Sequence, residues 1–368
     1  MRISFAGRRW VARTLVIAGA LLAARVCVAQ TTPSPALLVL EKPDGAMAIV
    51  DPATLKVVGR VPVGKDPHEI EASSDGKMAY ISNYGGLDST FNTIAVVDLA
   101  AQKPLAPISL GALRSPHGLA FAGGKLYFTA ETSKVFGRYD PATQAIDWVL
   151  GTGQDRTHMV IVSRDGERMF TSNVSSGTIS IIEQVMPPAP PGPPPGAPPG
   201  GGPPPGMPPG EPRKTWEVTN VPSGRGSEGF DLSPDGKTIW AANAQDGTVT
   251  VIDVAAKKAV ATFPVAVHGN RLKFTLDGKR VLVSGGAPGG PGAAGANFEV
   301  IDVASRKEIK QFNMGGGSAG ILVAPDGARA FVAVGGKNKI CVVDLKTLEV
   351  SGEAAVGNGP DGLAWAGK

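Results

Sequence analysis

The feature that most constrains this chain is a short apolar run that ends in an acidic residue and recurs seven times. The acids are Asp51, Asp98, Asp140, Glu183, Asp253, Asp302 and Asp344. Successive acids lie 42 to 49 residues apart, except for one interval of 70 residues that contains the proline-rich stretch 187–212. A recurring interval of this size is the signature of a repeat architecture. The chain is therefore expected to fold as seven similar units.

Each unit reads as four short strands. In the fourth unit, apolar residues alternate along EGFDLS, TIWAAN, TVTVID and AVATFPV, and the linkers PDGK and AQDG carry turn residues. No segment shows a helical period. Because a sheet of this size cannot bury both of its faces alone, the copies must pack face to face around an axis. The sequence predicts an all-β fold, a seven-bladed β-propeller with four antiparallel strands per blade.

The two ends of the chain predict how the ring closes. The N-terminal part supplies three strands, ALLVLE, AMAIVD and KVVGRVPV, and the chain ends in a single strand within GPDGLAWAGK. These segments together complete one four-stranded blade. The C-terminal strand is thus expected to pair with the N-terminal strands.

Two copies of the unit, DPHEIEASSDGKMAYISN and SEGFDLSPDGKTIWAAN, resemble the YVTN-type propeller repeat. The resemblance covers essentially all of residues 36–368. It implies an exported seven-bladed propeller related to lactonase-like and surface-layer propellers. Members of this repeat class also serve as binding modules and electron-transfer subunits, so the resemblance specifies the fold much more closely than the function.

The first 29 residues have the organisation of a cleaved signal peptide. A basic start precedes an apolar stretch from Thr14 to Ala24, and small residues follow at Cys27–Ala29. We therefore expect export by the general secretion or the twin-arginine route, and a periplasmic or secreted protein. Residues 30–368 are expected to form the propeller. The stretch 187–212 is expected to be a disordered Pro/Gly-rich insertion loop.

The charge balance argues against a nucleic-acid partner. The whole chain has a net charge of +4, but residues 1–29 contain five arginines and no acid, which leaves 4 − 5 = −1 for the remainder. A protein that binds nucleic acid depends on an excess of basic residues. No second long apolar segment follows, so the mature protein is expected to have no membrane span. It is also expected to be a monomer.

Three of the four histidines occupy the same position of the repeat. Alignment on the Asp-Gly turns places His68 and His158 at the start of the innermost strand, and the stretch SPHGLAF places His117 there in the unit between them. The equivalent residues of the other units are Glu228, Asn270, Ala319 and Asp361. Arg114, Arg156 and Arg225 stand just before these strands, and the loops after the second strands bring Asn83, Glu131, Asn173 and Asn243 to the same end. The predicted ligand-binding residues at this mouth of the central channel are His68, His117, His158, Glu228, Asn270, Asp361, Arg114, Arg156 and Arg225.

Three chemical interpretations of this mouth remain open. Imidazoles and carboxylates bind divalent transition metals, and the predicted metal ligands are His68, His117, His158 and Glu228. The same residues suit acid–base chemistry on a small anionic substrate that the arginines would hold. Alternatively, the histidines only cap the packing between blades.

The sequence accordingly predicts a binding scaffold first. In this hypothesis the channel mouth that carries the histidines, called the top face, binds a small molecule or a protein. The alternative is a metal-dependent, lactonase-like hydrolase or lyase that uses the His/Glu cluster. A third hypothesis is an accessory subunit of a redox or haem system. No catalytic residue is assigned.

Overall fold

The computed structural model describes residues 1, 32, 34–86, 89–163, 165–186, 214–287 and 295–367. The expected signal peptide, except for Met1, and the stretch 187–212 lie outside the described residues. The fold presented here belongs to the unit Thr31–Lys368. No helix in the described part of the chain has the length and apolar character needed to cross a bilayer.

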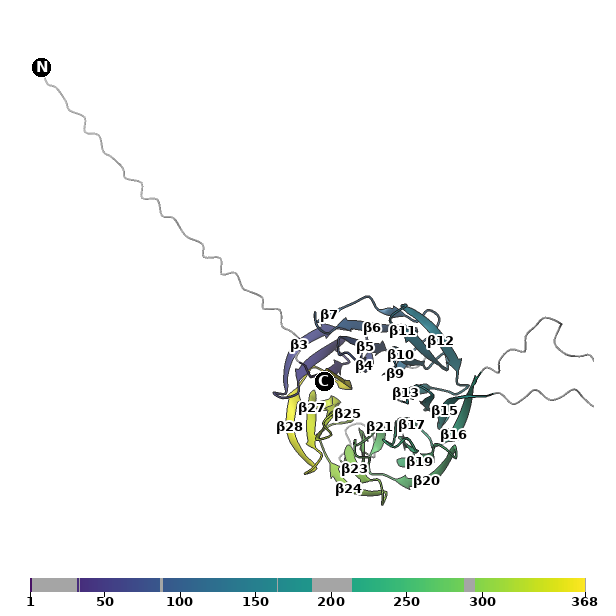
Figure 1. Cartoon of the computed structure of the whole chain (residues 1–368). Helices are drawn as coiled ribbons and strands as arrows, with labels where there is room; N and C mark the ends of the chain where they lie inside the picture. The colour runs from purple at the N-terminus through teal and green to yellow at the C-terminus, as the bar shows by residue number, and fades with distance from the viewer. Residues whose placement is uncertain are drawn as a thin grey trace, which may run out of the picture. The chain divides into compact units, whose positions relative to one another are not determined.

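Seven sheets of antiparallel strands surround a central axis, which confirms the predicted seven-bladed propeller (Figure 1). We number blades 1 to 6 from the sheet that begins with β4, and blade 7 joins the two ends of the chain. The inner strands of blades 1 to 7 are β4 (Pro67–Ala72), β9 (Pro116–Ala122), β13 (Thr157–Val162), β17 (Ser227–Leu232), β21 (His268–Phe274), β25 (Ser318–Val323) and β29 (Pro360–Ala366). The second strands are β5 (Met78–Asn83), β10 (Lys125–Ala130), β14 (Arg168–Asn173), β18 (Thr238–Asn243), β22 (Arg280–Gly286), β26 (Arg329–Val334) and β1 (Ala36–Glu41).

The third strands carry the recurring acids at or near their ends. They are β6 (Thr93–Asp98), β11 (Val135–Asp140), β15 (Thr178–Val185), β19 (Thr248–Asp253), β23 (Phe298–Asp302), β27 (Lys339–Asp344) and β2 (Ala46–Asp51). The outer strands are β12 (Ala145–Gly151), β16 (Thr215–Pro222), β20 (Lys258–Pro264), β24 (Lys307–Phe312), β28 (Glu349–Ala355) and β3 (Lys56–Pro62), and blade 1 has two short pieces, β7 (Lys103–Pro104) and β8 (Ile108–Ser109).

Blade 7 closes the ring as the sequence predicts. Its strand order is β29-β1-β2-β3, so the last strand of the chain pairs with the first. Leu38 of β1 lies opposite Ala364 of β29 in an antiparallel ladder. Both residues are buried in the same core cluster, which holds the two ends of the chain together by packing as well as by hydrogen bonds.

The hydrophobic cores lie between blades. Along β9, Leu119 and Phe121 pack into the cluster shared with blade 1, whereas Ala120 and Ala122 pack into the cluster shared with blade 3. Successive side chains of a strand point to opposite faces. Each blade therefore buries both faces, and a blade removed from the ring would expose both.

Every inner strand has a β-bulge at the position of the histidines. In blade 1, Pro67 pairs with Asn83 and Ile70 pairs with Ile81, so His68 and Glu69 together face Ser82 alone. The same shift of register occurs near the start of the other six inner strands. A bulge bends its strand and changes the direction of its side chains. In blades 1 to 4 and 7 the second residue of the strand reaches the centre of the ring, where His68, His117, His158, Glu228 and Asp361 meet.

Side-chain hydroxyl groups satisfy the amides that the bulges leave out of the ladder. The backbone N–H of Glu69 donates to Ser82 Oγ at 3.1 Å, and that of Gly118 donates to Thr129 Oγ1 at 2.8 Å. Met159 N–H donates to Ser172 Oγ at 3.2 Å. Because an unpaired buried amide is costly, these second-strand hydroxyl groups stabilise the bulges.

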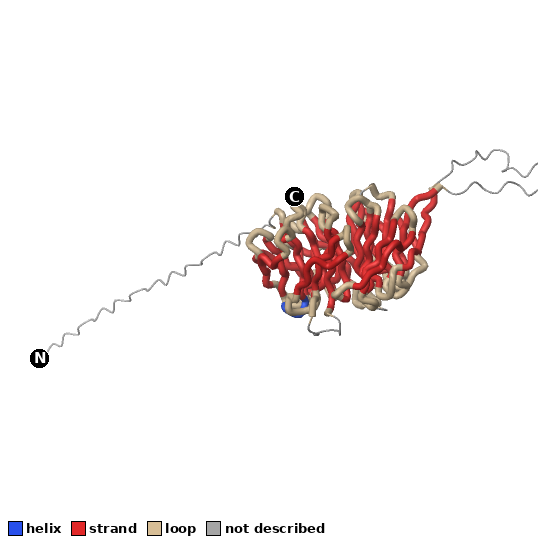
Figure 2. The backbone as a smooth tube through the Cα atoms, turned by 90° about the horizontal axis from the view of Figure 1, so that it is seen from below, coloured by secondary structure: helices blue, strands red, loops and turns tan. Residues whose placement is uncertain are grey.

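The two faces of the ring differ (Figure 2). The inner-strand starts lie on the face that also carries the short 3₁₀ helix η1 (Gly335–Lys337). Val185 and Thr215, which flank the proline-rich stretch, pair with each other at the far end of blade 3 from His158. The connection between Val185 and Thr215 therefore starts and ends on the face opposite the histidines.

Close approach of the blades requires glycine at the second bulge residue of blade 2. A Cβ atom on Gly118 would lie 2.5 Å from the carbonyl oxygen of His158 and 2.7 Å from Cα of Met159. Both are backbone atoms of blade 3 and cannot turn aside. We expect Gly118→Ala to lower the free energy of unfolding by about 1–3 kcal/mol in chemical denaturation. Gly151→Ala is the matched control, since nothing lies within 4 Å of its Cβ position, and its effect is expected within about 0.5 kcal/mol. Equal effects of the two substitutions would contradict this account.

Candidate functional site

The three repeat-related histidines meet at the centre of the ring. Each is the second residue of its inner strand, on β4, β9 and β13. The ring centroids of His68 and His117 are 4.3 Å apart, and those of His117 and His158 are 3.5 Å apart with the rings stacked. Tyr84, at the end of β5, places its ring against the edge of His117 at 4.8 Å. The spacing along the sequence therefore becomes a contiguous row of imidazoles.

His117, in the middle of the row, has no hydrogen-bond partner among the described residues. Its side chain is completely buried, and neither Nδ1 nor Nε2 has a partner. Burial lowers the pKa of His117 well below 6.5, and the nearby charges of His158, His68 and Arg271 lower it further. The imidazole is therefore neutral, with one nitrogen lone pair left free.

His158, at one end of the row, lies between two carboxylates. Its Nδ1 contacts Oε1 of Glu131, and its Nε2 lies 3.5 Å from Oε1 of Glu228. Burial opposes protonation, but the hydrogen bonds and charges of the two glutamates prevail and raise the pKa of His158. The other oxygen of Glu131 accepts a hydrogen bond from Tyr84 OH at 2.6 Å and lies 3.6 Å from Arg156 Nε. Despite its burial, Glu131 has a lowered pKa because of His158, Tyr84 and Arg156.

His68, at the other end of the row, is bound to a lysine. Nζ of Lys42 contacts Nδ1 of His68 and lies 3.4 Å from Oδ2 of Asp361 and 3.5 Å from Oδ1 of Asp66. Burial, opposed by the charge of Asp361 and assisted by Lys42 and Arg271, lowers the pKa of His68 to about 4. An ammonium group can only donate, so Nδ1 accepts and the proton of the neutral ring is on Nε2.

Arg271 joins blades that are not neighbours in the ring. Its guanidinium group comes from blade 5 and contacts Glu69 of blade 1. It lies 3.9 Å from Asp361 of blade 7, and 3.5 Å from Glu228 of the neighbouring blade 4. The residue is only 7% exposed. Burial alone would raise the pKa of Glu228, but His158 and Arg271 lower it to about 2. The arginine thus holds the acids of three blades at the axis.

The residues two positions before the histidines have left-handed backbone conformations. Asp66, Ser115 and Arg156 have φ values of 46°, 54° and 56°, whereas the Glu228 and Asp361 blades have Gly226 and Gly359 at this position. A left-handed conformation costs a non-glycine residue about 1–2 kcal/mol. Each of these three non-glycine side chains contacts another residue. Asp66 lies close to Lys42, and Ser115 Oγ shares a hydrogen bond with Thr132. Arg156 approaches Glu131. Strained residues of this kind concentrate at functional sites.

The structure brings together most of the predicted site residues. His68, His117, His158, Glu228, Asp361 and Arg156 belong to the cluster, and the carbonyl oxygen of Asn270 accepts a hydrogen bond from Arg271 at 2.8 Å. Two predicted arginines are engaged elsewhere. Arg114 donates to the carbonyl oxygen of Thr90, and Arg225, whose side chain is 77% exposed, pairs with Asp246 at 2.7 Å.

Four further residues of the cluster were not predicted from the sequence: Glu69, Arg271, Lys42 and Tyr84. Glu69 and Arg271 directly follow the aligned position, where blades 2, 4, 6 and 7 have Gly118, Gly229, Gly320 and Gly362. Those glycines allow close contact between blades. A charged residue in their place is a departure from the repeat, and this departure is the signal that would have identified both residues.

The cluster contains more carboxyl groups than permanent cations. Five carboxyl groups gather at the axis: Asp66, Glu69, Glu131, Glu228 and Asp361. Three permanent cations face them, Lys42, Arg156 and Arg271. Burial raises the pKa of Glu69, a shift that Arg271 opposes, whereas the pKa values of Glu131, Glu228 and Asp361 are lowered. A surplus of acidic groups favours cations over anions at this site.

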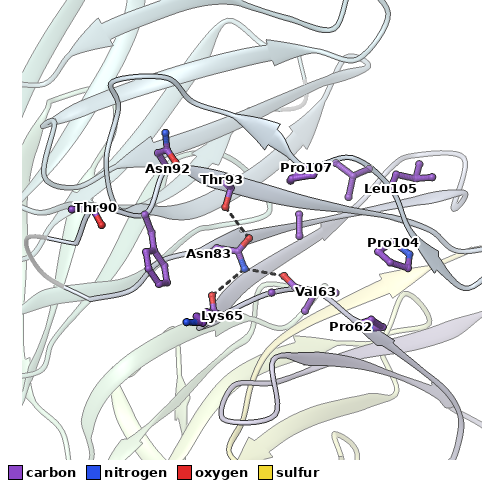
Figure 3. A pocket seen from close by; sticks show the side chains of 14 residues that line it. Pro62, Val63, Lys65, Asn83, Thr90, Asn92, Thr93, Pro104, Leu105 and Pro107 are labelled. Carbon is purple, nitrogen blue, oxygen red and sulfur yellow. Dashed lines mark hydrogen bonds between the residues drawn. The ribbon is translucent and has the colours of Figure 1, made fainter.

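A separate pocket lies beside the outer part of blade 1 (Figure 3). It has a volume of about 390 Å³ and is lined by apolar residues such as Val63, Phe91 and Leu105. The amide of Asn83 donates to the carbonyl oxygens of Val63 and Lys65, and its oxygen accepts a hydrogen bond from Thr93 (Figure 3). The polar groups of Asn83 are therefore bonded within the protein. The histidine cluster is the stronger candidate site.

Comparison with known proteins identifies the fold only. No protein-family model and no curated protein matches the chain. Among solved structures, a protein of unknown function from Desulfotomaculum acetoxidans is 12% identical with a TM-score of 0.67, covering 90% of this chain and 99% of its own. A “putative 6-phosphogluconolactonase” from Bacteroides uniformis is 14% identical with a TM-score of 0.65, again covering 90% and 99%. Kuenenia stuttgartiensis hydrazine synthase is 19% identical with a TM-score of 0.59, covering 81% and 89%.

The lowered pKa of His68 predicts a pH-dependent loss of stability. Between pH 6.5 and pH 4 an unfolded histidine binds a proton that native His68 does not bind, so stability falls as pH falls through this window. From pH 7 to pH 4.5, the wild type is expected to lose roughly 2–3 kcal/mol more than His68→Gln in urea unfolding. If the free energy of unfolding fell equally with pH in both proteins, the charged form of His68 would be as stable in the folded protein as in the unfolded chain, and the prediction would be wrong.

Proposed function

We propose that this protein is an exported YVTN-type propeller that binds a cationic ligand at the histidine cluster. The observation that carries the proposal is the surplus of carboxyl groups at the axis, where five of them face three permanent cations. Glu131, Glu228 and Asp361 all have lowered pKa values, so these three acids are ionised at neutral pH. The side chains of Glu228, Lys42 and Arg156 are about one quarter exposed, which gives a ligand access from this face.

The proposal of export rests on the sequence of residues 1–29. The basic start, the apolar stretch and the small residues before position 30 fit a cleaved signal peptide. The ligand-binding face would then be available in the periplasm or outside the cell. The net charge of −1 for the remaining chain fits a binding protein that has no nucleic-acid partner.

The positions of the arginines argue against a phosphorylated ligand. Two of the neighbouring structures are described as “putative 6-phosphogluconolactonase”. A phosphate group is best held by free arginine side chains. Of the three arginines expected at the mouth, Arg114 and Arg225 are bonded elsewhere, and Arg156 faces Glu131.

Binding of hexaamminecobalt(III) to the full chain tests the cationic ligand class. This trivalent cation keeps its own six ligands, so it reports electrostatic attraction without coordination by the protein. In titration calorimetry we expect binding that weakens as salt is added. Glu228→Gln is expected to weaken it by roughly 1 kcal/mol, or about fivefold in Kd. Glu349→Gln, which removes an exposed carboxylate of β28, is the matched control and should leave Kd unchanged. Equal effects of both variants, or no binding by the wild type, would refute the proposal.

A second candidate, hydrolysis of a neutral lactone, is favoured by the Glu131–His158 pair. A carboxylate that orients an imidazole is the arrangement of a general base. If the pair is catalytic, the wild type opens an unphosphorylated sugar lactone in a pH-stat assay, and His158→Gln lowers kcat by about 100-fold or more. A wild type without such activity would eliminate this second function and leave the binding proposal intact.

A further inference from the structure

We propose that His117, His158 and Glu131 bind one divalent transition-metal ion. This inference rests on the proposed function, because it names the cation that the acidic cluster takes. It also differs from the sequence-based ligand set, which included His68 and Glu228.

The unpartnered nitrogens of His117 carry the argument. Burying a polar group without a hydrogen bond costs roughly 1–3 kcal/mol, and buried polar groups that lack partners are rare in folded proteins. His117 is completely buried and has two such atoms. If the residue served only to pack this position, an aromatic ring without nitrogen atoms would be more stable there than histidine. A metal ion bound to the free lone pair accounts for the presence of histidine at this position.

The neighbours of His117 supply a suitable set of donors. One ligand atom from each of His117, Glu131 and His158 lies within 4.8 Å of the other two, and all three residues are buried. Two histidines and a glutamate are a known ligand set for zinc and its congeners, with a position left for water or substrate. Tyr84 OH holds the second oxygen of Glu131 at 2.6 Å, and such outer contacts orient a metal-binding carboxylate. The ion would replace the direct contact between Oε1 of Glu131 and Nδ1 of His158.

Internal cations already occupy the second group of donors. His68, Glu69 and His117 also bring their ligand atoms within 4.8 Å of one another. However, Lys42 contacts Nδ1 of His68, which leaves the proton on Nε2, and Arg271 contacts Glu69. These contacts remove His68 and Glu69 from the ligand set and limit the site to one ion. Glu228 belongs to neither group of donor atoms that lie within 4.8 Å of one another.

Cobalt(II) is the probe for the test. The full chain, purified without chelators, is dialysed against Co²⁺, and bound metal is measured together with the visible spectrum that reports nitrogen and oxygen ligands. We expect one equivalent per chain in the wild type. Affinity is expected to fall by at least ~10-fold in Glu131→Gln and in His117→Phe, as even loss of an outer contact to a metal ligand costs about that much. His268→Ala, which changes the one histidine outside the row, is the matched control and should retain one equivalent and the same spectrum. His68→Ala tests the choice of ligands, and it too should retain one equivalent.

His117→Phe also separates metal binding from packing. The phenyl ring fills the same space without buried nitrogens, so the metal-free variant should unfold at the same temperature as the metal-free wild type or higher, while Co²⁺ raises the unfolding temperature of the wild type alone. A metal-free variant that is clearly less stable would show that His117 serves the fold, and would overturn the inference.

The remaining outcomes distinguish this inference from the proposed function. A wild type that binds hexaamminecobalt(III) but no Co²⁺ would overturn the metal site and leave the cationic ligand class standing. Loss of Co²⁺ in His68→Ala as in His117→Phe would overturn the three-residue ligand set. A wild type that binds neither probe would overturn both proposals.

Discussion

Pairing of the last strand with the first is the interaction on which the rest of this structure depends. A blade buries both of its faces only between two neighbours, and β29 supplies the inner strand that blade 7 otherwise lacks. The closed ring fixes seven inner strands around one axis. Residues at one repeat position are thereby brought to a common centre, although His68 and Asp361 are almost 300 residues apart in the chain. Closure therefore creates the site as well as the fold.

The bulges convert this convergence into a polar cluster. A regular inner strand directs alternate side chains into the two neighbouring blade interfaces, where apolar residues are required. One extra residue at each strand start releases one side chain from this alternation. Ser82, Thr129 and Ser172 satisfy the displaced amides, so the cost of the irregularity is small. The cluster can thus vary from blade to blade while the cores behind it stay apolar.

The sequence predicted the fold far more completely than the site. Blade number, strand order and closure follow from a repeated pattern, because each repeat reports the same local structure. The convergence of His68, His117 and His158 follows from that pattern too. The contacts between non-neighbouring blades do not follow from the repeated pattern. Arg271 reaches Glu69 across the axis, and no periodicity relates residues that far apart in the ring. Likewise, the engagement of Arg225 with Asp246 depends on a local choice of partner that the repeat does not specify.

The distribution of cations within the cluster explains why its three imidazoles are not equivalent. Lys42 contacts Nδ1 of His68 at one end of the row, and Glu131 contacts Nδ1 of His158 at the other. Nε2 of His158 lies 3.5 Å from Glu228 and has no hydrogen-bond partner among the described residues. Arg271 neutralises part of the acidic charge on the side of Glu69 and Asp361. The middle imidazole receives no hydrogen bond from any described residue, and the pKa of Glu131 beside it is lowered by His158, Tyr84 and Arg156 despite burial. A repeat that only copied histidines would leave three similar environments. The three environments differ instead, and among the described residues only His117 of the row has no partner for either ring nitrogen.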